Sequence, residues 1–320
     1  MFLGIDIGGT RIKAGVVDRT GVVLRADAAP TPGYLAEFRA IVGGLASGLA
    51  AGLPVEGVGI GCCGIIRSSD TMVECLPGRM DYLEGRPLSE FVAASIPGET
   101  SVFADNDARA ALSGEIMFGA ARGKTNVLML TLGSGVGGAI LADGRIARGH
   151  ADRAGHIGHL TVDPDGPFCL CGNRGCLETR FSARAIEIEA IAAIRRGCDS
   201  LLRARHESNP LSVTCADVFQ YAAEGDIVAR SIVEQAVKYL GGALAGLLHV
   251  LDPEIVIVGG QIADAGEALF SPLREDASRR TRRLLGRAVP IVHAEVGDRS
   301  GVVGAASLAI RALQNSGATL

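Results

Sequence analysis

Residues 3–18, LGIDIGGTRIKAGVVD, place two short aliphatic runs on either side of a Gly-Gly-Thr turn. Strand-forming runs joined by a glycine turn predict two adjacent strands, and the run VVLRADAAP at 22–30 predicts a third. The same pattern returns at 126–149, NVLMLTLGSGVGGAILADGRIARG, where three strands and two turns are again expected. Two copies of one pattern in one chain predict a weak internal duplication.

Each copy is followed by helices and strands in alternation. The segments with helical spacing of apolar residues are 33–52, 108–121, 226–250 and 301–314, and those that read as strands are 55–62, 101–107 and 253–262. The last helix is expected to fold back on the first lobe. The sequence therefore predicts an α/β protein of two lobes with a cleft between them.

Composition excludes several classes of protein. The 320 residues are 48% hydrophobic and 21% charged, which is typical of a soluble globular chain. A net charge of −4 argues against a nucleic-acid partner, and no apolar run reaches the ~18 residues of a membrane span. The start lacks the basic region of a signal peptide, so we expect a cytoplasmic protein without a membrane partner.

Eight cysteines are too few for a disulfide scaffold in a chain of this length. Three of them are clustered at 169–176, and clustered cysteines in a reducing compartment favour a metal site. The other five are expected to be small buried apolar residues: Cys62, Cys63, Cys75, Cys198 and Cys215.

Glycine turns after strands are candidate phosphate sites, because they let backbone N–H groups approach an anion closely. Asp6 is placed to hold Mg²⁺, and Lys13 or Arg11 to reach a terminal phosphate. An ordinary hairpin turn is the alternative, and TLGSGVGG at 131–138 is not a Walker A motif, because no Gly-Lys-Ser/Thr follows. The candidate nucleotide-binding residues are Asp6, Gly8, Gly9, Thr10, Lys13, Thr131, Gly133, Ser134, Gly135, Gly259 and Gly260.

The segment 155–178, GHIGHLTVDPDGPFCLCGNRGCLE, carries two histidines and the three clustered cysteines. Three thiolates and one imidazole fill the four positions of a tetrahedral Zn²⁺, which makes such a site structural. Gly172 and Gly175 suit a loop wrapped on a metal, and a reduced metal-free loop is the alternative. The letters HIGH also occur in class I aminoacyl-tRNA synthetases, but no lysine follows Lys238 to form their KMSKS loop.

The stretch 105–111, DNDARAA, lies where a strand gives way to a helix. Asn106 and Asp107 are in themselves ordinary helix caps. An amide and a carboxylate at this point are also able to reach a substrate in the cleft, and phosphoryl transfer to an alcohol needs such a base.

Four motifs, LGIDIGGTRIKAGVVD, DNDARAA, TLGSGVGGAIL and CLCGNRGCLE, together resemble the ROK family of sugar kinases and repressors, over residues 2–312. The resemblance implies a two-lobed actin-like ATPase (ribonuclease H-like) fold with an inter-lobe cleft. Its lobes would be 1–118, with the helix 300–316 packed back on it, and 119–299, which carries the zinc loop. It also implies ATP-dependent phosphorylation of a sugar 6-hydroxyl with ATP, Mg²⁺ and structural Zn²⁺, by a homodimer.

The resemblance assigns roles to single residues. Asp107 is the general base, and the sugar ligands are Gly64, Asn106, Asp107, His156, His159 and Glu178, with Arg79 as a further candidate. Glu178 is otherwise a surface carboxylate. The zinc ligands are His159, Cys169, Cys171 and Cys176.

His156 departs from the family pattern, in which most sugar-phosphorylating members have Glu at this place. Some bacterial N-acetylmannosamine kinases resemble this chain here, so N-acetylmannosamine is favoured over glucose as the substrate. A glucokinase is the alternative, as is loss of catalysis in a sugar-binding protein. ROK regulators carry a helix-turn-helix ahead of the kinase-like body, and here the phosphate turn begins at residue 4. The arginine-rich run 274–287 is expected to be a solvated helix face.

Overall fold

The computed structural model describes residues 1–78, 80–96 and 100–315. Its contacts divide the chain into two compact units, labelled unit 1 and unit 2 below. Unit 1 comprises Met1–Thr125, Ala139–Gly155 and the chain from Ala294, and unit 2 comprises Asn126–Gly138 and His156–His293. The chain therefore passes between the units four times. The division of the chain into lobes 1–118 and 119–299 stays a prediction.

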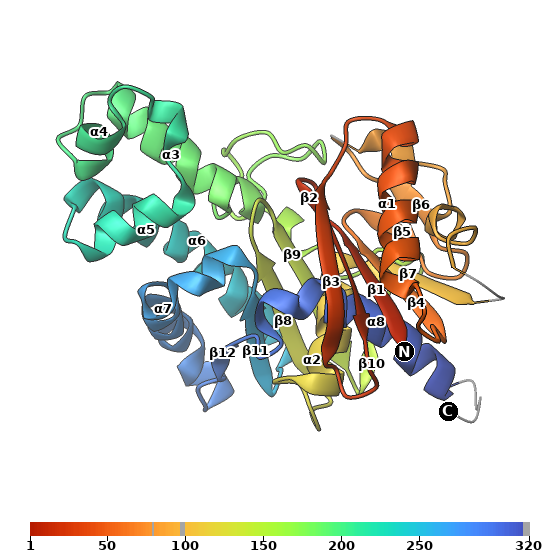
Figure 1. The fold of residues 1–320 in the computed structure, drawn as a ribbon. Helices are drawn as coiled ribbons and strands as arrows, with labels where there is room; N and C mark the ends of the chain where they lie inside the picture. Colours follow the sequence, from red (N-terminus) through yellow and green to blue (C-terminus); the bar gives the residue numbers. More distant parts are fainter. Residues whose placement is uncertain (79, 97–99, 316–320) are drawn as a thin grey trace. The chain divides into compact units, whose positions relative to one another are not determined.

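Unit 1 is built on a five-stranded sheet (Figure 1). Its order is β3 (Val23–Pro30), β2 (Arg11–Val17), β1 (Phe2–Ile7), β4 (Gly57–Cys62) and β7 (Ser101–Asn106). The first three strands pair antiparallel as the meander predicted at 3–30, and β1, β4 and β7 run parallel. Because the strand pattern is aliphatic on both faces, helices must cover both.

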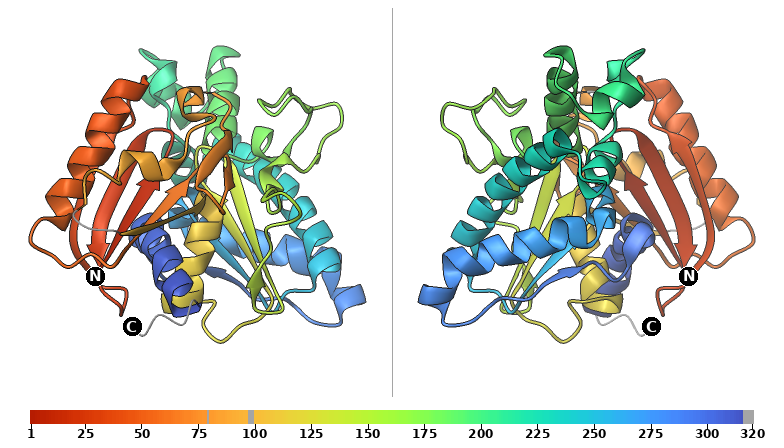
Figure 2. Two further views of the ribbon diagram at one scale, coloured as in Figure 1. Left: turned by 90° about the vertical axis from the view of Figure 1, so that its right-hand side faces the viewer. Right: turned by 90° about the vertical axis from the view of Figure 1, so that its left-hand side faces the viewer.

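Alternate residues of β1 point to opposite faces of this sheet. Leu3, Ile5 and Ile7 join a buried cluster with α1 (Leu35–Ala50), whereas Phe2 joins the cluster of α8 (Ser300–Asn315). Figure 2 shows α8 beside α2 (Asp107–Phe118), and the two helices have many contacts. The helix predicted at 301–314 therefore packs on the first sheet.

The α8 helix approaches the sheet unusually closely because two strand positions have no side chain. A Cβ on Gly4 would overlap the carbonyl oxygen of Val302, and one on Gly59 would overlap that of Ala305. Glycine at both positions lets backbone meet backbone.

A second five-stranded sheet has the order β10 (Arg145–Ile146), β9 (Val136–Ala142), β8 (Val127–Leu132), β11 (Ile255–Gly259) and β12 (Ile291–His293). Again three consecutive strands come first, and β8, β11 and β12 run parallel. The two sheets share one strand order, as the repeated pattern at 3–18 and 126–149 predicts.

Besides short 3-10 helices, the described residues also form a short hairpin and a set of α-helices in unit 2. The hairpin, β5 (Ile65–Arg67) and β6 (Met72–Cys75), belongs to unit 1. The helices of unit 2 are α3 (Ala183–Arg195), α4 (Leu201–His206), α5 (Cys215–Ala223), α6 (Ile227–Leu251) and α7 (Glu267–Leu285).

Two of these helices bear on sequence predictions. The segment 226–250 is helical, as predicted, in α6. Most of the arginine-rich run lies on α7, where Arg280 pairs with Asp276 at 2.7 Å and is 41% exposed. That supports the solvated helix face. Among the described residues, none of the helices combines the length and apolar character that a membrane crossing requires.

Candidate active site

Three parallel strands of unit 1 end at one edge of its sheet. Ile7, Cys62 and Asn106 are in register at the ends of β1, β4 and β7, and α2 begins at the next residue, Asp107. Asp6 therefore lies at the same edge as Asn106 and Asp107, which is where ligands bind in open α/β sheets.

The carboxyl group of Asp6 has a raised pKa. Burial, and next the negative charge of Asp107, raise the pKa of Asp6 to about 6, against the opposing effect of Lys13. Lys13 is the cross-strand partner of Asp6 on β2. Two carboxylates so placed favour a bound cation, because Mg²⁺ takes one or two carboxylates with phosphate oxygens.

Asn106 caps α2. Its Oδ1 accepts the N–H of Ala108 at 3.0 Å, and its Nδ2 donates to the carbonyl oxygen of Gly64 at 3.1 Å. The cap interpretation from the sequence is thus realised, and it places Asn106 and Gly64 together. The amide keeps one further N–H that a sugar hydroxyl can accept from.

Asp107 is the first residue of α2, where the helix dipole favours a negative charge. Its Oδ1 accepts the N–H of Ala108 at 2.9 Å. The turn between β1 and β2 is held by Gly8 N–H donating to Arg11 O at 3.1 Å and by the Thr31 hydroxyl donating to Gly8 O at 2.6 Å. It is a tight hairpin turn that leaves Gly9 exposed.

The candidate nucleotide residues of the second half come together in unit 2. Gly259 pairs with Thr131 across β11 and β8, and Gly260, with φ +88°, lies against the backbone of Leu132. In the turn that follows β8, Gly133 N–H donates to Gly135 O at 3.0 Å. One edge of this sheet therefore carries both glycine turns, with Ser134 between the two glycines of the first.

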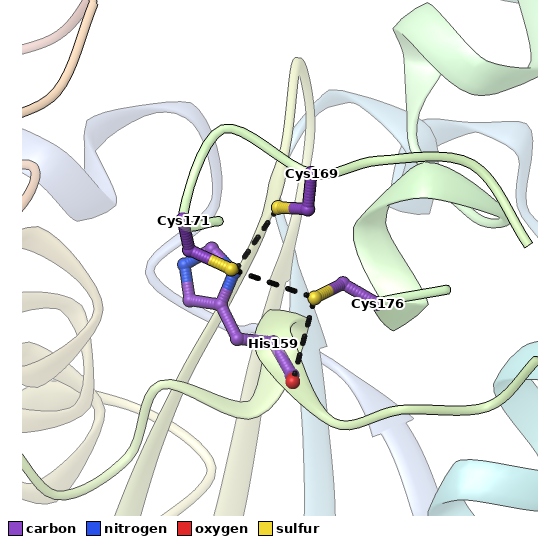
Figure 3. A group of neighbouring side chains, drawn as sticks. All are labelled: His159, Cys169, Cys171 and Cys176. Carbon is purple, nitrogen blue, oxygen red and sulfur yellow. Dashed lines mark hydrogen bonds between the residues drawn. The ribbon is translucent and has the colours of Figure 1, made fainter. Parts of the chain in front are cut away.

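The four predicted metal ligands converge (Figure 3). One ligand atom from each of His159, Cys169, Cys171 and Cys176 lies within 4.8 Å of the others. The Sγ atoms of Cys171 and Cys176 are 3.6 Å apart, and His159 Nδ1 is 3.5 Å from Cys169 Sγ. Since Zn–S bonds of ~2.3 Å in a tetrahedron separate sulfurs by ~3.8 Å, the cluster fits Zn²⁺.

Local backbone geometry brings these ligands together. Gly172 (φ +89°) and Gly175 (φ +63°) have left-handed conformations, and Cys169 N–H donates to Asn173 O at 2.8 Å. A side chain on Gly175 would overlap the carbonyl oxygen of Asp163. Glycine is therefore required at the second of these positions.

Glu178 lies against the cluster. Its Oε1 accepts from Cys169 Sγ at 3.0 Å and is 3.6 Å from His159 Nδ1, and its Oε2 lies close to Gly135. Burial and the Glu178 carboxylate raise the pKa of the Cys169 thiol. Glu178 is therefore not an isolated surface carboxylate: it connects the metal cluster with the glycine turn after β8.

His156 precedes the one-turn helix Ile157–His159. The rings of His156 and His159 are nearly parallel, at 14°, with centroids 6.3 Å apart. Three groups named as sugar ligands, His156, His159 and Glu178, thus share one loop region of unit 2.

The candidate sugar ligand Arg79 lies outside the described residues. Two residues near this edge, Gly301 and Arg109, were not predicted from the sequence. Gly301 in the first turn of α8 makes room for the Asp6 carboxylate. Arg109 is a charged residue that is only 1% exposed and pairs with Asp105. The i,i+4 spacing of Asp105 and Arg109 is the sequence signal by which this pair could have been found. Of the five scattered cysteines, Cys62 and Cys215 are buried as expected, and the other three are partly exposed.

The chain is similar to known proteins over most of its length. A glucokinase of Streptomyces coelicolor is 35% identical over 315 residues, covering 96% of each chain. The structure of a ROK-family glucokinase from Streptomyces griseus, in complex with glucose and AMPPNP, has a TM-score of 0.84 at 32% identity and covers 97% of this chain and 99% of its own. A xylose repressor of Caldicellulosiruptor bescii is 30% identical over 80% of this chain and 63% of its own.

The model of the ROK family matches residues 2–312, which contain all four motifs identified in the sequence. The structural relatives have the two-lobed actin-like fold, as expected from the resemblance of the four motifs to the ROK family. The chain belongs to the ROK family.

Proposed function

We propose that this chain, an ATP-dependent carbohydrate kinase, transfers the γ-phosphoryl group of ATP to the 6-hydroxyl of a hexose. The observation that carries the proposal is the edge of the first sheet, where Asp6 and Asp107 lie together beside the capped Asn106. The similarity to glucokinases along nearly the whole chain supports glucose as the substrate.

Asp107 is the proposed general base. The helix dipole favours the charged form of a carboxylate at the start of a helix, and a carboxylate is able to accept the proton of the attacking hydroxyl. Asn106 donates its remaining N–H to a sugar hydroxyl, and the Gly64 carbonyl holds Asn106 in place at 3.1 Å. These residues supply position and a base, which is most of what phosphoryl transfer needs.

Asp6 is the proposed holder of Mg²⁺, which when bound neutralises charge on the phosphates. Lys13, the cross-strand partner of Asp6, is the proposed contact of the terminal phosphate. The glycine turns at 8–10 and 133–135 and the pair Gly259–Gly260 supply backbone N–H groups to ATP.

The Cys₃His cluster is proposed to hold a structural Zn²⁺, because four protein ligands leave no open position for water. It would fix the loop that carries His156, His159 and Glu178 to the sugar. His159 has two ring nitrogens, so one is able to bind the metal while the other contacts substrate.

N-acetylmannosamine is the second candidate substrate, and His156 favours it. Most sugar-phosphorylating family members have a Glu carboxylate at this place, which accepts hydrogen bonds from sugar hydroxyls. A neutral imidazole there removes a negatively charged acceptor. A bulky 2-acetamido group depends on such an acceptor less than a free hydroxyl does. The relatives at 30% identity or more include glucokinases, so glucose is the first substrate to test. A homodimer, a cytoplasmic location and the absence of a nucleic-acid partner stay predictions.

A coupled ATP-consumption assay over hexoses and N-acetylhexosamines tests the proposal, with the phosphorylated position identified by NMR. Sugar-dependent ATP consumption with a 6-phosphate product is expected. ATP consumption that no sugar stimulates, from protein that is folded and contains zinc, would contradict it and favour a sugar-binding regulator, as the similarity to a xylose repressor allows.

A further inference from the structure

A buried ion pair joins the end of β7 to the first turns of α2: Asp105 lies on β7, and Arg109 lies on α2, two residues after the proposed base. Arg109 is 1% exposed and Asp105 0%. The Arg109 Nε and the Asp105 Oδ1 are 2.5 Å apart, and Arg148 Nη1 lies 2.6 Å from the other carboxylate oxygen. Burying charges costs free energy unless they are paired, so such a group needs a reason to be retained.

The Arg109 guanidinium pairs with the Asp105 carboxylate and also donates hydrogen bonds to a neighbouring loop. Its Nη1 donates to the carbonyl oxygens of Asp152 and Ala154, both at 3.1 Å. These two carbonyls belong to the loop 148–154, which is closed by Ala154 N–H donating to Arg148 O at 2.9 Å. Arg109 therefore holds the end of this loop from which the chain continues to Gly155 and His156.

The same loop is held from a second side. Asp152 accepts the backbone N–H and the hydroxyl of Ser68, each at 3.2 Å, and Arg153 pairs with Glu74 at 3.0 Å. Ser68 and Glu74 belong to the β5–β6 hairpin region, which begins directly after Gly64. The loop 148–154 is thus connected both to α2 and to the segment of the proposed sugar ligand Gly64.

We propose that Arg109 is a positioning residue for sugar binding: it fixes the loop 148–154 against the start of α2. The proposal rests on the proposed function. Arg109 lies two residues after Asp107 and three after Asn106, and the loop it holds ends two residues before His156. One guanidinium, only 1% exposed, therefore sets the backbone next to three of the proposed sugar contacts.

Arginine is specifically suited to this task. Its planar fork donates from Nε to a carboxylate and from Nη1 to carbonyls at the same time, whereas the single ammonium of lysine is a compact charge. Arg109→Lys keeps a positive charge opposite Asp105 and loses the fixed link to the carbonyls of Asp152 and Ala154. This variant therefore tests the positioning of the loop 148–154 while the charge opposite Asp105 is kept.

The matched control is Arg25→Lys. Arg25 on β3 also donates from Nη1 to two carbonyl oxygens of one segment, Leu49 at 3.2 Å and Ala51 at 2.8 Å. That segment is the end of α1 and contains none of the proposed site residues. If Arg109→Lys fails to fold, the double variant Asp105→Asn with Arg109→Gln removes both buried charges together, which is less costly than leaving one unpaired.

Three measurements are made on each folded variant: the KM for sugar, the KM for ATP, and amide hydrogen exchange of the peptide that covers 148–156. We expect Arg109→Lys to raise the sugar KM by about tenfold, the equivalent of roughly one lost hydrogen bond, and to leave the ATP KM within about twofold. Exchange should accelerate in the 148–156 peptide. Arg25→Lys should change none of the three.

A sugar KM that stays at the wild-type value in Arg109→Lys, or a parallel rise in both KM values, would overturn the proposal. So would unchanged exchange at 148–156. Failure of the proposed function looks different: the wild-type chain would then phosphorylate no sugar, and direct calorimetric titration with glucose and N-acetylmannosamine takes the place of the sugar KM. Accelerated exchange with weakened binding of either sugar would support the positioning role, and unchanged binding would contradict it.

Discussion

The first turn of α8 presses against the Asp6 carboxylate at Gly301. A Cβ atom on Gly301 would overlap the Oδ2 atom of Asp6. Asp6, the proposed metal ligand on β1, is thus able to lie where it does because residue 301, near the other end of the sequence, is a glycine.

Gly301→Ala should displace Asp6 and lower kcat/KM for ATP by about tenfold or more, because small misplacements of positioning groups are costly. The sugar affinity should change little. Gly48→Ala on α1 is the control, since a Cβ there meets open space and alanine favours a helix. Unaltered ATP kinetics in folded Gly301→Ala would show that the position of Asp6 does not matter.

Asp6 makes the metal-free protein less stable as pH rises. Burial and Asp107 raise its pKa from 3.8 to about 6, so the native state binds this proton more tightly than the unfolded state does. Stability is lost as pH rises from about 4 to about 6, by roughly 3 kcal/mol in total, and the loss persists at higher pH.

Asp6→Asn removes that titration. Its unfolding temperature without Mg²⁺ should therefore exceed that of the wild type by a margin that grows between pH 4.5 and pH 7. Calorimetry at several pH values measures the margin. A constant difference across this range would mean that Asp6 titrates normally. Added Mg²⁺ with ATP should stabilise the wild type more than the variant, because the variant lacks the proposed metal ligand.

Asp107→Asn tests the base. We expect kcat to fall by about a hundredfold or more with sugar affinity kept within about tenfold, because the amide keeps the shape and loses the proton acceptor. Rapid-quench kinetics with the best sugar measure the chemical step. Retention of a tenth of the wild-type rate would exclude Asp107 as the base.

Elemental analysis should find about one zinc per chain in protein purified without added metal. Cys171→Ser should lose the metal and raise the KM for sugar more than the KM for ATP. Cys198→Ser is the control, because Cys198 is a free cysteine outside the cluster. Full activity after complete chelation would show that the loop does not depend on a metal.

His156→Glu should shift kcat/KM towards glucose relative to N-acetylmannosamine. One well-placed polar contact accounts for a change of about 1–3 kcal/mol in this ratio. Competition assays with both sugars in one reaction measure it directly. An equal loss on both sugars would assign His156 to loop orientation alone.

The local pattern of the sequence was enough for the two meanders, because alternation of aliphatic runs with glycine turns fixes strands whatever surrounds them. It was also enough for three ligands of the Cys₃His cluster, since the cysteines lie within eight residues, whereas the resemblance to the ROK family selected His159 as the fourth. The third strand of the first meander, expected at 22–30, is β3 at Val23–Pro30.

Gly301 and Arg109 were not predictable in the same way. The role of Gly301 depends on Asp6, which is separated from it by nearly the whole chain, and a glycine near a helix start has no local signature for such a contact. Arg109 showed an i,i+4 partner in Asp105, but its bonds to Asp152 and Ala154 arise from packing between distant segments.

The close contact of α8 with the first sheet has a consequence for synthesis on the ribosome. Residues 300–315 supply one wall of the core around Phe2 and Gly59, yet they are translated after all of unit 2. While unit 2 is being synthesised, the face of the amino-terminal sheet that α8 later covers stays exposed. The part of the chain that emerges first is therefore the last to complete its fold, and chaperones would find their target there.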